Sequence, residues 1–177
     1  MLRSIDVPQA NALETVRQVV YAIDRGVCRL EELADFTGFS VRHTGYRLHA
    51  ARILGLVRLV DDEASITALG ERLLCTDPKS TKERSVFYDA IVGSAVIQLL
   101  VPDLLSLVPP NTETITSRLF ERTKLRESTA QRRAGGLLAW RRYVYGEAAK
   151  QTPPGRKRNA QGARTDAPIQ LDLFESL

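Results

Sequence analysis

The fold is decided by the stretch from Ser40 to Thr67, which reads SVRHTGYRLHAARILGLVRLVDDEASIT. Its first half repeats apolar residues at helical spacing behind Ser40, a residue type that caps helices, and Gly55 marks a stop. After Gly55 the apolar residues alternate with a period of two, which is typical of strands. Asp61-Asp62-Glu63 forms the turn between them. The stretch therefore predicts a helix over 41–54 and a β-hairpin over 56–67.

Helices are predicted on both sides of this stretch. The first covers 11–24, with Asn11 as its cap and Gly26 just past its end. A short amphipathic helix over 30–36 ends at Gly38, and Thr67 caps a further helix through Leu74. Three helices and a hairpin in this order resemble the winged helix-turn-helix domain. We therefore expect a mainly α protein in which residues 1–78 form such a domain.

The second half is predicted to be helical throughout. Ser80 or Thr81 caps a helix to residue 93, and the apolar stretch 95–107 places Pro102 at a helix start. After the breaker at 109–112, Thr112 or Thr114 caps a helix to residue 123, and a long helix covers 128–145. A weak repeat aligns this last pair of helices with 30–54. Residues 79–146 are thus expected to form a second, helix-turn-helix-like domain.

The composition changes again at residue 147. Residues 147–169 contain little that could be buried and several Arg and Lys, which predicts a disordered basic linker. Residues 170–177 are apolar once more. Because apolar side chains beyond such a linker cannot easily join a core, we expect this octet to dock on a partner.

Positive charge is concentrated on the two predicted long helices. The chain carries a formal net charge of +4, but residues 113–143 hold eight Arg and Lys against three acidic residues. Residues 40–60 hold four Arg and no acidic residue at all. A surface that faces phosphates needs this kind of clustering. Arg-rich helical faces can also be simply solvated, and many winged helices bind protein instead.

Candidate DNA contacts follow from the position of each long helix, since the second helix of a helix-turn-helix enters the major groove with its N-terminal residues. The turn Asp61-Asp62-Glu63 is acidic and would be repelled by phosphate, so we expect the hairpin to point away from DNA. The second helix pair is the better candidate. The predicted DNA-binding residues are Arg42, His43, Thr44 and Arg47 in the first unit, and Arg126, Ser128, Gln131, Arg132 and Arg133 in the second.

The end of the chain carries a recognisable motif, Gln170-Leu171-Asp172-Leu173-Phe174. It resembles the peptide with which bacterial polymerases and repair proteins bind the replicative sliding clamp, the β subunit of DNA polymerase III. The resemblance covers these five residues only. It implies that Gln170 anchors the peptide at the rim of the clamp pocket and that Leu173 and Phe174 fill an apolar cleft. A terminal stub that packs back on the body, or an oligomerisation arm, is the alternative.

The sequence offers little support for catalysis. Gly135-Gly136 lies inside a predicted helix, where it indicates close packing and not a nucleotide loop. His43 and His49 have no partner ligands at metal-binding spacing. Cys28 and Cys75 are expected to be reduced and largely buried. We expect no cofactor, no metal and no enzymatic activity. The absence of a long apolar run and of a signal-peptide core predicts a cytoplasmic protein with no membrane contact, and the expected DNA binding would make it nucleoid-associated.

The leading hypothesis is a non-enzymatic DNA-binding accessory factor that is tethered to the sliding clamp and acts in DNA replication or repair. One alternative is a transcriptional regulator of a mobile-element or defence locus, for which a homodimer on a palindromic site is possible. The other is a protein–protein adaptor or inhibitor of the clamp.

Overall fold

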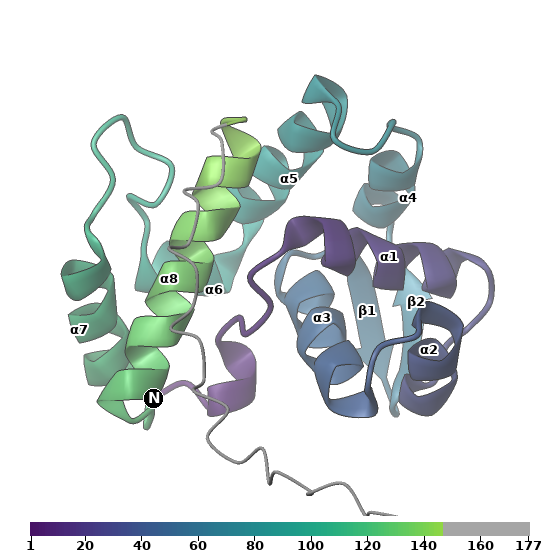
Figure 1. Cartoon of the computed structure of the whole chain (residues 1–177), viewed down its shortest axis with the longest axis horizontal. Coiled ribbons are helices and arrows are strands. Elements are labelled where there is room, and N and C mark those ends of the chain that lie inside the picture. The colour runs from purple at the N-terminus through teal and green to yellow at the C-terminus, as the bar shows by residue number, and fades with distance from the viewer. Residues whose placement is uncertain (147–177) are drawn as a thin grey trace, which may run out of the picture.

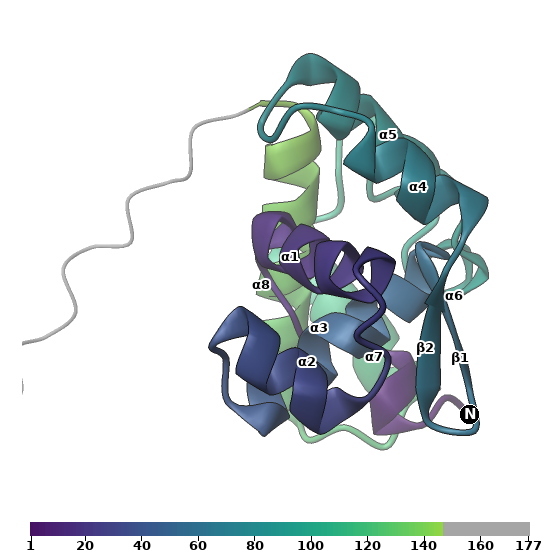
Figure 2. The same ribbon diagram turned by 90° about the vertical axis from the view of Figure 1, so that its right-hand side faces the viewer.

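A computed structural model describes residues 1–146 of the chain. This range is mainly helical and contains one small two-stranded antiparallel sheet (Figure 1). In chain order its first elements are α1 (Leu13–Asp24), α2 (Leu30–Thr37), α3 (Val41–Ile53), β1 (Val57–Val60), β2 (Glu63–Ile66) and α4 (Ala68–Leu74). Figure 2 shows the β1–β2 hairpin on the opposite side of the molecule from α8 (Glu127–Val144).

The predicted caps at Ser40 and Thr67 and the predicted turn of the hairpin are confirmed. The Ser40 hydroxyl accepts from the His43 amide, and the Thr67 hydroxyl accepts from the Gly70 amide. The hairpin pairs Val57 with Ile66 and Val60 with Glu63. Asp61 and Asp62 take positive φ angles of 49° and 62°, as the tight turn of a two-residue hairpin requires.

The second part is formed by α5 (Thr81–Gly93), α6 (Ala95–Leu100), α7 (Thr112–Arg122) and α8. Pro102 does not begin a helix, because α6 ends at Leu100 and no helix is assigned between residues 101 and 111. The cap of α7 is Asn111, whose side chain accepts from the Thr114 amide, and not Thr112 or Thr114. Asn11 does not cap α1, which begins after Ala12 without a side-chain cap.

One hydrophobic core cluster joins the two predicted units. It contains Val20 and Leu54 from the first unit and Phe87, Leu137 and Trp140 from the second. The indole of Trp140 is fully buried, and its Nε1 donates to the carbonyl of Ala10 at 2.9 Å. The described residues therefore share one interior, and a division at residue 78 stays a prediction.

The first twelve residues lie against the second unit although they precede α1. The short 3₁₀ helix η1 (Ser4–Asp6) lies between α3 and α8 (Figure 1). Leu2 forms a β-bridge with Thr123, and its amide donates to the carbonyl of Arg122 at 3.0 Å. This segment ties α7 and α8 to the helices that follow it in the chain.

Both cysteines are free thiols, but they are not largely buried as expected. Cys28 is half-buried and Cys75 is exposed. Cys28 precedes α2 and Cys75 follows the last residue of α4, so both lie at element ends where the core does not cover them.

Candidate nucleic-acid interface

Helix α3 exposes its first basic residues as predicted. Arg42 and His43 are exposed at the N-terminal end of the helix. The Nε of Arg42 donates to the hydroxyl of Tyr46 at 2.5 Å, and the guanidinium lies 5.6 Å from the centre of that ring. These contacts hold Arg42 on the helix surface with part of its hydrogen-bonding capacity already used.

Arg47 is fixed more firmly, one turn further along α3. Its guanidinium stacks on the ring of Phe39 at 3.9 Å and donates to the carbonyl of His43 at 2.9 Å. The side chain is half-buried, and this burial lowers the pKa of the guanidinium. The contacts with Phe39 and His43 therefore hold the guanidinium of Arg47 in place, and solvent hydrates its charge only in part.

Thr44 does not fit its predicted role. It is fully buried, and its hydroxyl donates to the carbonyl of Ser40 at 3.1 Å within the helix. The prediction that Thr44 contacts a DNA backbone is wrong, because this residue lies on the face of α3 that packs into the core.

In the second unit, four of the five predicted residues are exposed. Arg126, Ser128, Gln131 and Arg132 lie at or near the beginning of α8. Arg133 is the exception, since only 5% of it is exposed. Its guanidinium donates to the carbonyls of Ser4 at 2.5 Å and Val7 at 3.2 Å, and to the hydroxyl of Ser4 at 2.7 Å.

Arg133 therefore cannot lie on a DNA-facing surface in the way the sequence suggested. It binds the N-terminal segment to α8, a role that requires the folded position of Ser4 and could not be read from the pattern of α8. Its Nε has no hydrogen-bond partner, and its contacts are made to carbonyls and a hydroxyl. Burial and the neighbouring Arg132 lower the pKa of Arg133.

The two basic helices meet across a cleft of about 390 Å³. Helix α3 contributes His43, Tyr46 and Arg47, and α8 contributes Arg132, Arg133 and Arg142 together with Gly135, Gly136 and Ala139. The remaining lining comes from residues 9–11 and Thr15. Four arginines and a histidine thus face one hollow, and none of the residues that line it is acidic. We call it the arginine cleft.

The structure brings together residues that the sequence assigned to separate DNA-binding units. His43 and Arg47 of the first unit share the cleft with Arg132 and Arg133 of the second. Arg42, Arg126, Ser128 and Gln131 do not line it. Two residues of the cleft, Tyr46 and Arg142, were not among the predicted DNA-binding residues. The sequence could have indicated Arg142, because the helical spacing of Arg132, Gly135, Gly136, Ala139 and Arg142 places them along one face of α8.

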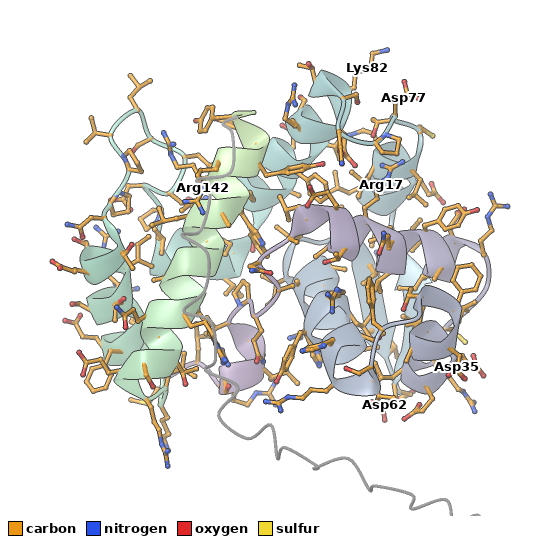
Figure 3. The ribbon with its side chains drawn as sticks, in the orientation of Figure 1. Arg17, Asp35, Asp62, Asp77, Lys82 and Arg142 are labelled. Atoms are coloured by element: carbon orange, nitrogen blue, oxygen red, sulfur yellow. The ribbon has the colours of Figure 1, made fainter. Side chains whose placement is uncertain are left out.

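Acidic side chains lie on other parts of the surface. Asp35 and Asp62 project from the side of the first unit that is remote from α8 (Figure 3). The neighbouring Glu63 is engaged by Arg29, with 3.0 Å between Nη2 and Oε1. The acidic hairpin turn therefore does not contribute to the arginine cleft.

A second feature that the sequence did not reveal is the buried carboxylate of Glu83, which lies where α5 meets α1 and α8. Glu83 is 1% exposed and accepts from the Lys79 amide at 2.6 Å and from the Tyr143 hydroxyl at 2.5 Å. Its other oxygen lies 3.4 Å from Nη1 of Arg17, which itself donates to carbonyls at the end of α4. Burial, followed by the hydrogen bond to Glu83, raises the pKa of Tyr143. We call this network the Glu83 lock.

The glycine pair in α8 also differs from expectation. A Cβ built on Gly135 would meet no atom within 4 Å, so close packing does not explain this glycine. Gly136 faces Asn11, where a Cβ would lie at an ordinary contact distance of 3.7 Å. Both glycines line the arginine cleft, and the absence of side chains there keeps the middle of it open.

No family model, curated protein or solved structure matches this chain. Within residues 1–146 no group of His, Cys, Asp or Glu side chains is arranged to hold a metal ion. None of the helices described there is long and apolar enough to cross a bilayer. The clamp-binding motif at Gln170–Phe174 lies outside the described residues, as does the predicted linker.

Proposed function

We propose that this protein is a non-enzymatic DNA-binding factor that holds a phosphate backbone in the arginine cleft and docks on the sliding clamp through Gln170–Phe174. The observation that carries the first half is the composition of the cleft. Four arginines from two helices line one hollow that no carboxylate lines, and because Arg133 binds the N-terminal segment, Arg47, Arg132 and Arg142 are the three proposed to contact a ligand. Buried and half-buried cations without acidic partners are costly, and an anionic ligand would compensate them.

The spread of the charges favours a polyanion over a single small anion. Arg132 and Arg142 are ten positions apart on α8, which corresponds to about 15 Å along the helix axis. One phosphate group cannot bridge that distance, whereas successive phosphates of a nucleic acid can follow it. Arg42, Arg126 and Gln131 lie exposed outside the cleft, where they could add contacts to the same ligand.

The element order supports the interpretation of the first unit as a winged helix-turn-helix domain. Helices α2 and α3 are joined by a short turn at Gly38, and the hairpin follows α3 directly. In this interpretation α3 is the recognition helix. Its N-terminal end borders the arginine cleft, so the recognition helix would act together with α8.

The terminal motif supplies the second half of the proposal. A peptide of five residues buries little surface, so its affinity for the clamp should be modest and concentrated in Leu173 and Phe174. A second contact to DNA raises the effective concentration of such a peptide near a clamp that encircles the same DNA. The two weak contacts would then place the protein at sites of replication or repair.

Binding of labelled DNA, followed by fluorescence anisotropy at several salt concentrations, tests the cleft. We expect Arg132→Ala and Arg142→Ala each to weaken binding and to reduce the slope of log affinity against log salt by about 0.7 to 0.9. Arg58→Ala is the matched control, because Arg58 is an exposed arginine on β1 outside the cleft. Equal effects of all three substitutions would mean that net charge alone matters and that the cleft is not the site.

Capture of purified clamp by the full-length protein tests the tail. The double variant Leu173→Ala with Phe174→Ala should lose capture, because these side chains would fill the apolar cleft of the clamp. Asp172→Ala is the control, since the motif tolerates change at that position. Undiminished capture by the double variant would refute clamp docking and leave the DNA proposal standing.

A further inference from the structure

Two further hollows adjoin the arginine cleft. A second hollow of about 300 Å³ shares Asn11, Ala139 and Arg142 with it. That hollow in turn shares Glu14 and Tyr143 with a third pocket of about 550 Å³. The three hollows are therefore neighbours: α1 and α8 contribute residues to all three, α3 lines the first, and the third also reaches α2 and residues 78–83. We call the three hollows together the groove.

The walls of this groove limit what can enter it. A duplex is read by a single helix of about 10–12 Å diameter that inserts into a major groove about 12 Å wide. Side chains that face inward between two helices cannot reach base edges in that way. Arg132 is exposed, whereas Arg47 and Arg142 are half-buried in the lining of the cleft. A ligand that contacts all three must enter a hollow of about 390 Å³, which is too small for a duplex.

The middle of the groove has clearance that protein packing does not use. Glycine weakens a helix interior relative to alanine, yet Gly135 occupies the centre of α8 and its missing Cβ would touch nothing within 4 Å. Glycine is the residue that permits close approach of a ligand to a backbone. Arg133 lines the cleft with 5% exposure; its two terminal nitrogens bind Ser4 and Val7, and its Nε has no hydrogen-bond partner.

The chemistry of the groove changes from one end to the other. The arginine cleft contains the cations together with Tyr46, whose ring lies 6.0 Å from that of His43. The far pocket is lined by Tyr21, Phe36 and Tyr143, and its charges are mixed: Arg17 pairs with Glu83, and Glu14 and Lys79 both line the pocket. Phosphates are therefore favoured at the first end and flat apolar groups at the second.

We propose that this groove binds a single strand of nucleic acid, with phosphates at Arg47, Arg132 and Arg142 and bases stacked on Tyr46 and in the pocket of Tyr21 and Phe36. A positive groove with interleaved aromatic rings is the arrangement by which proteins hold single strands without reading their sequence. This inference rests on the proposed function, since it names the form of nucleic acid that the cleft accepts. It makes α3 a wall of the cleft in place of a helix that enters the major groove of a duplex.

The test compares three labelled ligands of about 16 nucleotides: single-stranded DNA, single-stranded RNA and duplex DNA. The full-length protein should bind the single strand about tenfold more tightly than the duplex, as the contribution of one stacked base implies. Gly135→Leu should fill the groove without removing charge and weaken single-strand binding by about tenfold or more. Gly93→Leu is the matched control, because Gly93 is a helical glycine with open space around it outside the groove.

Intact folding of each variant is checked by the emission of Trp140, and Tyr46→Leu carries the test if Gly135→Leu fails to fold. Single-strand binding that neither Gly135→Leu nor Tyr46→Leu weakens would overturn the inference. Tight duplex binding with weak single-strand binding would overturn it too, while leaving the proposed function intact. Salt-insensitive or absent binding of all three ligands would refute both. Equal affinity for single-stranded DNA and RNA would support a groove that holds bases and phosphates of either nucleic acid. A preference for DNA would identify single-stranded DNA as the ligand.

Discussion

Removal of the Glu83 carboxylate should destabilise the protein more than any exposed charge substitution. The side chain is 1% exposed, and Glu83→Ala would leave the Lys79 amide and the Tyr143 hydroxyl without their acceptor. It would also leave the guanidinium of Arg17 without a carboxylate. Breaking a buried pair on one side costs about 3–5 kcal/mol. Because Arg17 keeps its bonds to the carbonyls of Leu73 and Thr76, we expect a loss of about 3 kcal/mol, at the lower end.

The measurement is urea unfolding followed by the fluorescence of Trp140, the single tryptophan of the chain, a fully buried residue of α8 whose indole donates to the carbonyl of Ala10. With a slope of about 1–3 kcal/mol per molar urea, a loss of this size moves the midpoint by about 1 M or more. Such a shift is several times larger than the error of the measurement.

Two variants separate the buried network from charge in general. Glu83→Gln keeps an acceptor for Tyr143 and should cost about half as much as Glu83→Ala, roughly 1–2 kcal/mol. Asp89→Ala removes another carboxylate of α5, but one that pairs with Arg72 at an exposed site, and should change stability by less than about 1 kcal/mol. If Glu83→Ala and Asp89→Ala behave alike, the Glu83 lock does not stabilise the junction of the two units.

Three further outcomes are expected. Burial raises the pKa of Tyr143 above the ordinary 10.0, so the tyrosine ionises at a lower pH in the unfolded chain than in the folded protein. Stability should therefore fall as pH rises above about 10. Urea midpoints measured across that range should fall less steeply for Tyr143→Phe. Burial lowers the pKa of His49 below the ordinary 6.5, so stability should fall as pH drops below about 6.5, and His49→Gln should remove part of that slope. In thermal melts, Gly70→Ala should destabilise by about 1–3 kcal/mol because its Cβ would lie 2.2 Å from the carbonyl oxygen of Leu56, whereas Gly135→Ala should stabilise by up to about 1 kcal/mol.

Local chemistry was readable from the sequence wherever a residue acts on its immediate neighbours. Ser40 and Thr67 cap the helices that follow them, and the switch of period after Gly55 located the hairpin to within one or two residues. Errors arose where two local signals competed. Asn111 lies one residue before Thr112, and its side chain caps α7 because it accepts a hydrogen bond from the Thr114 amide.

The burial of charged residues was not readable in the same way. Arg133 belongs to a run of basic residues that suggests a solvated or DNA-facing surface, yet its guanidinium satisfies carbonyls of the N-terminal segment. Glu83 follows a cap on a helix of mixed composition, yet it is buried between Arg17 and Tyr143. In both cases the partner is distant along the chain, and no periodicity within one helix reports it.

The sequence by itself determined the helices, the hairpin, most of their ends, and which helices carry positive charge. Only the tertiary structure decided that α3 and α8 line the same hollow, so that Arg47 and Arg142 belong to one cleft and Arg133 binds the N-terminal segment. The physical reason is that periodicity shows which face of a helix is covered but not what covers it. The pairing of faces depends on contacts between distant segments, and here the shared core, the N-terminal segment and the Glu83 lock join the two units that line the arginine cleft.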